Sequence, residues 1–394
     1  MPHVKSVSIG FWVNAGSRDE DPEAAGVSHL IEHMLFKGTT RRSAKDIAKA
    51  IDSVGGTMDA FTSRENTCFY AKVLGEHLPL AVDLLTDVLL NSTFNPADIE
   101  RERQVVLQEI RMVEDSPDDL IYDLFAETIW GDHPLARPVL GRKETLSKIE
   151  RGEIMAYLKD FYQPDRLIVS AAGDLVHERL VDLLLTSMKG WNGKGRNPNS
   201  SRPEALYRVL NTEKSSAQVH LCLGVESLPY AHPERYTLNL LNAIIGGGVS
   251  SRLFQEIREK RGLAYSIYSY HSSFRDSGLL VIYAGTNPES YEEVVDLILT
   301  ELRRLASEPI EEEEFKKAKE QLKGNLLLGL ESTSSRMTRL AKMEIYMGRI
   351  YDLDEILKGI EAVTPERFYS LAQILLSNGK YALSSIGPIP RREQ

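Results

Sequence analysis

A chain of 394 residues exceeds what one hydrophobic core usually serves, so the sequence predicts two domains. A composition of 42% hydrophobic and 26% charged residues is ordinary for a globular protein, and no apolar run approaches the length of a membrane span, which argues against a membrane protein. The formal net charge of −10 argues against nucleic acid as a partner. The two cysteines lie inside strand-like runs, which indicates buried thiols in a reducing compartment and not a disulfide framework.

Apolar periodicity divides the chain into strands and helices. The first half shows, in chain order, a strand at 7–13, helical periods at 28–36 and 44–54, a strand at 67–74, helical periods at 77–90, 96–114 and 149–162, and a strand at 167–173. The second half shows a strand at 219–225, a helix near 235–248 and a strand at 382–387. Grouped strands with helices packed on one face predict the α+β class.

The helical period at 28–36 carries the most informative motif. His29 and His33 stand four residues apart, so on a helix both imidazoles lie on one face and can reach one metal ion, with Glu32 beside them. Zinc catalysis needs nitrogen ligands, an open position for water and a carboxylate that takes the proton of that water. A histidine on an apolar helix face is more often a hydrogen-bonded core residue, and this interpretation is kept for the histidines at 3, 77, 133, 220, 232 and 271.

A third ligand is expected from the long charged helix at 96–114, where the candidates are Glu100, Glu102, Glu109 and Glu114. The order His-x-x-Glu-His is the inverzincin signature. With this motif the chain resembles the M16 family of metallopeptidases, the relatives of pitrilysin and of the mitochondrial processing peptidase. In that family the third ligand is a glutamate roughly seventy residues beyond the second histidine, in a segment of the form E-x6-E.

Glu109 follows His33 with 75 residues between them, and Glu102 stands seven residues before Glu109. The resemblance therefore implies that His29, His33 and Glu109 bind Zn²⁺ and that Glu102 orients a ligand or a histidine N–H. It also implies that Glu32 acts as the general base and then passes the proton to the leaving amine.

The two halves of the chain look like copies of one plan. The segment 81–89 matches 294–302 at an offset of 213 residues, and each half closes on a strand that ends in glycine, at Gly173 and Gly387. A stretch rich in Gly, Pro, Asn and Ser separates the copies, as is typical of a linker. We therefore expect a catalytic zinc-binding domain at 1–190, a linker at 191–210 and a homologous domain without zinc ligands at 211–394.

The second copy lacks the zinc motif, and Leu322 stands where Glu109 would be, so one zinc per chain is expected. The segment 246–265 resembles a marked segment of the family, in which an arginine and a tyrosine seven residues apart bind the substrate backbone and stabilise the tetrahedral intermediate. Arg258 and Tyr265 have this spacing, so the resemblance implies these roles for them. The alternative is that Arg258 forms a surface ion pair and Tyr265 begins a strand.

The stretch 57–63 precedes the strand at 67–74. In the family an edge strand near this position receives the substrate peptide in extended form, so the resemblance implies substrate contacts at Ala60 and Phe61. It also implies two α+β domains, each a mainly antiparallel sheet with helices on one face. Family members usually have a further strand before the one at residue 7, so we expect this chain to be shortened at that end.

Together the motifs predict a zinc-dependent endopeptidase or oligopeptidase acting on unfolded peptides in an enclosed chamber. Two domains form only half of such a chamber in this family, and short bacterial members pair, which implies a homodimer in which Arg258 and Tyr265 serve the opposite zinc site. The alternatives are a heterodimer with a non-catalytic homologue, or a structural subunit like the core proteins of respiratory complexes, whose motif is typically degraded. No signal or transit segment is visible, so the expected location is the cytoplasm, without membrane or nucleic-acid partners.

Overall fold

The computed structural model describes residues 1, 3–198 and 201–389, so residues 199–200 of the expected linker lie outside the described residues. The chain forms two compact units. Unit 1 comprises 1–112, 137–199 and 328–350, and unit 2 comprises 113–136, 200–327 and 351–394. Each unit thus includes a segment from the other half of the sequence. The division at 1–190 and 211–394 concerns the duplication of the sequence and stays a prediction.

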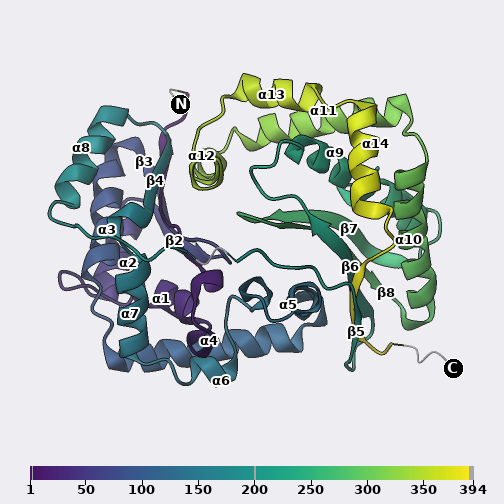
Figure 1. Ribbon diagram of the computed structural model, residues 1–394. Helices are drawn as coiled ribbons and strands as arrows, with labels where there is room; N and C mark the ends of the chain where they lie inside the picture. The colour runs from purple at the N-terminus through teal and green to yellow at the C-terminus, as the bar shows by residue number, and fades with distance from the viewer. Residues whose placement is uncertain (2, 199–200, 390–394) are drawn as a thin grey trace. The chain divides into compact units, whose positions relative to one another are not determined.

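Unit 1 contains a four-stranded antiparallel sheet in the order β2-β3-β1-β4 (Figure 1). Its strands are β1 (Ser6–Val13), β2 (Thr57–Thr62), β3 (Thr67–Leu74) and β4 (Leu167–Gly173). Its helices are α1 (Val27–Leu35), α2 (Ala44–Asp52), α3 (Leu78–Asn91), most of α4 (Pro96–Asp115), α6 (Lys143–Leu146), α7 (Arg151–Phe161), α8 (His177–Ser187) and α12 (Thr333–Met347). Strand β2 therefore forms one edge of this sheet.

The two faces of the sheet in unit 1 follow from the alternation in β1. The odd-numbered residues from Val7 to Val13 are buried in one core with apolar residues of α1 and α3. Trp12 points to the opposite face, where it packs with Met337 and Ala341 of α12. Helix α12 contacts β4 and β1 (Figure 1) although it comes from the second half of the sequence. The periodicity of the first half alone did not predict this layer.

Unit 2 contains a five-stranded sheet in the order β5-β9-β6-β8-β7, antiparallel except for the parallel pair β5–β9. Its strands are β5 (Val209–Glu213), β6 (Val219–Ser227), β7 (Ala264–Ser273), β8 (Gly278–Thr286) and β9 (Ala382–Gly387). Its helices are α5 (Pro117–Trp130), α9 (Arg235–Gly246), a π-helical stretch at Phe254–Glu259, α10 (Tyr291–Ser307), most of α11 (Glu312–Gly329), α13 (Leu353–Glu361) and α14 (Pro365–Leu376). Helix α5, from the first half of the sequence, packs against β6 and β9.

The predicted α+β class with two mainly antiparallel sheets is confirmed. The order β7-β8-β6-β9 repeats the order β2-β3-β1-β4, as expected of two copies of one plan. Predicted strands at 67–74, 167–173 and 382–387 coincide with β3, β4 and β9. In the described part of the chain, no helix is both long and apolar enough to cross a membrane.

Candidate metal centre

Helix α1 presents the motif because its apolar and polar residues fall on different faces. Leu30, Ile31 and Met34 are buried in the core of unit 1, whereas Glu32 and His33 are only partly buried. The burial of the apolar face fixes the rotation of the helix. The side chains that carry the chemistry are thereby directed away from the core.

The start of α1 requires a glycine. Gly26 has a φ of +98°, and a Cβ at this position would lie 2.8 Å from the Leu140 carbonyl oxygen and 3.0 Å from the Gly141 Cα. Positive φ is costly for a residue with a side chain, and here the neighbouring atoms are backbone that cannot rotate away. Gly26 thus sets the angle at which the chain enters the helix.

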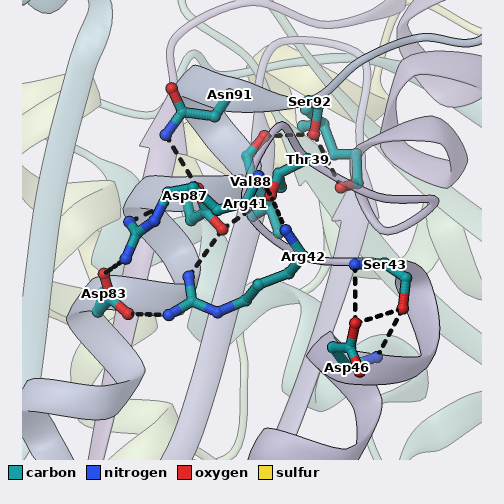
Figure 2. A network of polar contacts seen from close by, with 11 residues as sticks. Thr39, Arg41, Arg42, Ser43, Asp46, Asp83, Asp87, Val88, Asn91 and Ser92 are labelled. Atoms are coloured by element: carbon teal, nitrogen blue, oxygen red, sulfur yellow. Dashed lines mark hydrogen bonds and ion pairs between the residues drawn. The ribbon is translucent and has the colours of Figure 1, made fainter.

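The end of α1 is fixed to α3 by polar contacts (Figure 2). The Ser92 hydroxyl lies 2.7 Å from the Val88 carbonyl oxygen in α3 and 2.9 Å from the Leu35 carbonyl oxygen in the last turn of α1, so its one proton is shared between the two helices. Beyond the helix, the Thr39 hydroxyl and the Arg42 guanidinium both donate to Oδ2 of Asp87, at 2.9 Å and 2.7 Å. The Asp87 side chain is fully buried, so this carboxylate anchors the loop that follows α1.

Three predicted ligands converge within unit 1. Oε2 of Glu109 on α4 lies 3.8 Å from His29 Nε2 and 3.6 Å from His33 Nε2. One ligand atom from each of the three residues can be chosen so that all lie within 4.8 Å of one another. Two imidazole nitrogens and one carboxylate oxygen are a donor set that zinc takes in hydrolases, with a further position left for water. The residues present therefore fit a zinc ion.

Burial keeps the first of these ligands neutral. The pKa of His29 is lowered to about 4 by its burial and, secondarily, by the charge of His33. A metal ligand must be deprotonated, so the His29 imidazole offers its lone pair over the whole neutral range. Its other ring nitrogen, Nδ1, is buried and has no hydrogen-bond partner among the described residues.

Glu102 holds the ring of His33. Its Oε2 lies 3.2 Å from His33 Nδ1, which leaves Nε2 facing Glu109. Its other oxygen, Oε1, pairs with Lys37 Nζ at 2.8 Å. Lys37 had not been predicted as part of the site. Its position four residues after His33 is the only sequence signal that could have indicated it.

Glu32 is held by the strand at the edge of the sheet. The Thr62 hydroxyl of β2 donates to Glu32 Oε2 at 2.6 Å. Burial raises the pKa of Glu32, while this hydrogen bond acts in the opposite direction. A carboxylate of raised basicity beside the ligands can accept a proton from water. Thr62 was not predicted, because its contact with Glu32 crosses thirty residues of sequence.

The proposed substrate contacts Ala60 and Phe61 lie on this same strand and point to opposite faces. Ala60 packs against the core of unit 1, whereas Phe61 is 36% exposed and meets Trp12 edge-to-face at 5.4 Å between ring centroids. Strand β2 is the edge of its sheet, so its outer backbone groups have no strand partner among the described strands.

Arg258 and Tyr265 come together in unit 2. They line one pocket of about 280 Å³, and the Arg258 Cζ atom lies 5.0 Å from the Tyr265 ring and 4.8 Å from the Phe254 ring. Among the described residues Arg258 has no ion-pair partner. Tyr265 is the second residue of β7 and is 75% exposed. The structure thus places the two side chains side by side at one pocket of unit 2, and their role in binding stays a prediction.

Comparison with known proteins relates both halves to one group of peptidases. Residues 1–143 match the model described as insulinase (peptidase family M16), and residues 148–322 match the model of the peptidase M16 inactive domain. An uncharacterized zinc protease of Bacillus subtilis is 44% identical over 98% of this chain and 94% of its own, and one of Rickettsia felis is 38% identical over 96% and 92%.

Solved structures show the same fold. A protease from Helicobacter pylori superposes with a TM-score of 0.91 at 21% identity, covering 98% of this chain and 95% of its own. A structure from Pseudomonas fluorescens described as a peptidase M16 inactive domain also gives 0.91 at 21% identity, covering 100% and 96%. At this identity the likeness concerns the fold alone.

Proposed function

Because the chain belongs to the M16 family of peptidases, we propose that it is a zinc-dependent endopeptidase that hydrolyses peptide bonds of unfolded peptides. The observation that carries the proposal is the convergence of His29, His33 and Glu109, with Glu32 beside them. All four residues lie in the part of the chain that matches the M16 peptidase model. Residues 148–322 match the model of the inactive domain, and this supports a single zinc site per chain.

The roles of the residues follow from their contacts. His29, His33 and Glu109 would hold the ion, which when bound lowers the pKa of water to about 7 and polarises the scissile carbonyl. Glu32 takes the proton from the attacking water and delivers it to the leaving amine. Glu102 keeps the His33 ring in the orientation that presents Nε2 to the ion.

Substrate binding is assigned to two elements. The free edge of β2 pairs with the peptide backbone, and Ala60 and Phe61 contact its side chains. Arg258 and Tyr265 bind the substrate backbone and stabilise the negative charge that develops on the attacked carbonyl oxygen. Backbone pairing reads little sequence, so the proposed selectivity is for extended, unfolded chains.

The proposed assembly is a homodimer in the bacterial cytoplasm that encloses the substrate in a chamber. A heterodimer with a non-catalytic homologue would serve the same chemistry. A purely structural role, like that of the respiratory core proteins, is disfavoured by the complete donor set, since such a role places no demand on His29, His33 or Glu109.

The decisive experiment is cleavage of a quenched fluorescent peptide library by wild type and by Glu32→Gln, with zinc measured on both. We expect wild type to cleave, and Glu32→Gln to retain zinc while its turnover falls by a factor of about 10³ or more, because the general base is lost. Glu23→Gln, a change of an exposed glutamate in unit 1, is the matched control and should cleave normally. Zinc-loaded wild type that cleaves none of the peptides would contradict the proposed function.

A further inference from the structure

Glu20 lies in front of α1, and its carboxylate faces the first turn of that helix. Its Oε2 accepts a hydrogen bond from the Gly26 N–H at 2.8 Å, and its Oε1 accepts one from the Ser28 N–H at 2.9 Å. The Ser28 hydroxyl also donates to Oε1. Glu20 is only 4% exposed. Two N–H groups at the start of α1, which have no partner inside the helix, are thus bound by a carboxylate from outside it.

The backbone of Glu20 is itself fixed. The guanidinium of Arg137 donates to the Glu20 carbonyl oxygen at 2.8 Å. Burial raises the pKa of the Glu20 carboxyl to about 7, while its hydrogen bonds act in the opposite direction. The group is therefore mostly ionised at pH 8.

The ligand next to this contact depends on the helix backbone for its orientation. His29 directly follows Ser28, in the first turn of α1. The ring of His33 is held by Glu102, but Nδ1 of His29 has no hydrogen-bond partner among the described residues. The direction of the His29 ring is therefore set by the backbone of the first turn and by packing.

The charge of Glu20 matters as well. A helix N-terminus carries a positive partial charge of about half an elementary charge, which disfavours a cation in the first turn. His29 would hold a divalent cation at this place. A carboxylate bound to the same N–H groups offsets the repulsion.

We propose that Glu20 is a positioning residue of the zinc site, which fixes the first turn of α1, and with it His29, and supplies the negative charge that a cation there requires. This inference rests on the proposed zinc site, and it concerns metal affinity and not cleavage. The hydrogen bonds of the Glu20 carboxylate go to Gly26 and Ser28, so Glu20 acts through the backbone of the first turn.

The test is zinc affinity at pH 8, measured by competition with a chromophoric chelator on folded protein. Glu20→Gln keeps the shape but loses the charge and one acceptor oxygen, and it should weaken zinc binding by about 10-fold or more. Ser28→Ala keeps the charge but loses one hydrogen bond, and it should weaken zinc binding about 3-fold. Asp46→Asn is the matched control, because Asp46 accepts from the Ser43 N–H at the start of α2, which bears no ligand.

The thermal midpoint of the metal-free variants separates the possible roles. A merely structural role of Glu20 would lower this midpoint and leave the zinc affinity of the folded protein within about 2-fold of the control, which would overturn the proposal. If Glu20→Gln does not fold, the affinity of Ser28→Ala decides by the same criterion. Wild type that binds no zinc would also overturn it, whereas wild type that binds zinc without cleaving peptides would contradict only the peptidase function.

Discussion

At the scale of single residues, the proposed general base depends on a hydrogen bond from another element. Glu32 is on a helix, and the Thr62 hydroxyl that donates to it is on the edge strand β2. Burial favours the neutral form of Glu32, and the hydrogen bond favours the ionised form that can accept a proton. Thr62 therefore both orients the base and supports its charged state.

Replacement of Thr62 by valine keeps the shape of the side chain and removes this donor. We expect kcat to fall at least about 10-fold, since a hydrogen bond to a charged group contributes about 1.5–3 kcal/mol and about 1.4 kcal/mol corresponds to a factor of ten in rate. The zinc content should be unchanged because Thr62 touches no ligand. The measurement is steady-state cleavage of a fluorescent peptide, with Thr57→Val on the same strand as the control. A kcat equal to that of Thr57→Val would show that the contact has no part in catalysis.

At the scale of elements, α1 is a short helix whose two ends are fixed by distant parts of unit 1. A helix of nine residues is marginal on its own, so its stability comes from tertiary contacts. Ser92 binds the carbonyl of Leu35 at one end, and Gly26 passes close to Gly141 at the other. The positions of His29 and His33 on this helix therefore depend on the contacts at both of its ends.

The close passage at Gly26 can be tested with a pair of glycine substitutions. Gly26→Ala combines a φ of +98° with a Cβ 2.8 Å from backbone, whereas Gly55→Ala combines a φ of +65° with no atom within 4 Å. We expect Gly55→Ala to cost about 1 kcal/mol, and Gly26→Ala to cost at least about 2 kcal/mol more. Thermal unfolding of the metal-free proteins measures both. Equal midpoints for the two variants would mean that the backbone contact adds no strain.

At the scale of the whole molecule, the proposed homodimer makes a specific prediction about shared sites. If Arg258 and Tyr265 serve the zinc site of the opposite chain, a chain without its base and a chain without its arginine can complement each other. In a mixed dimer of Glu32→Gln and Arg258→Ala, one site has both an intact Glu32 and an intact Arg258 from its partner.

Mixing the two inactive variants should therefore restore activity to about a quarter of wild type, since about half of the dimers are mixed and each has one complete site. The measurement is peptide cleavage after the variants have been unfolded and refolded together, compared with each variant refolded alone. Light scattering should give twice the chain mass of 44.3 kDa. Dimers that form without any regain of activity would place all catalytic groups of a site in one chain.

The sequence by itself determined the class of fold, and it predicted most of the residues that the structure brings together in the candidate metal centre. His29 and His33 could be predicted because a spacing of four residues on a helix fixes their relative position without any other part of the chain. Glu109 required the family resemblance, and the structure brings its carboxylate to both histidines. Strands such as 67–74 could be placed because their apolar alternation reflects burial against one core.

Only the tertiary structure decided which distant residues support the site. The contacts of Thr62 with Glu32 and of Lys37 with Glu102 join residues far apart in sequence, and such pairs leave no periodic signal. The same holds for α12, which completes unit 1 from the second half of the chain. Local spacing records which face of an element is buried, but not which element buries it. That choice depends on the packing of the whole chain.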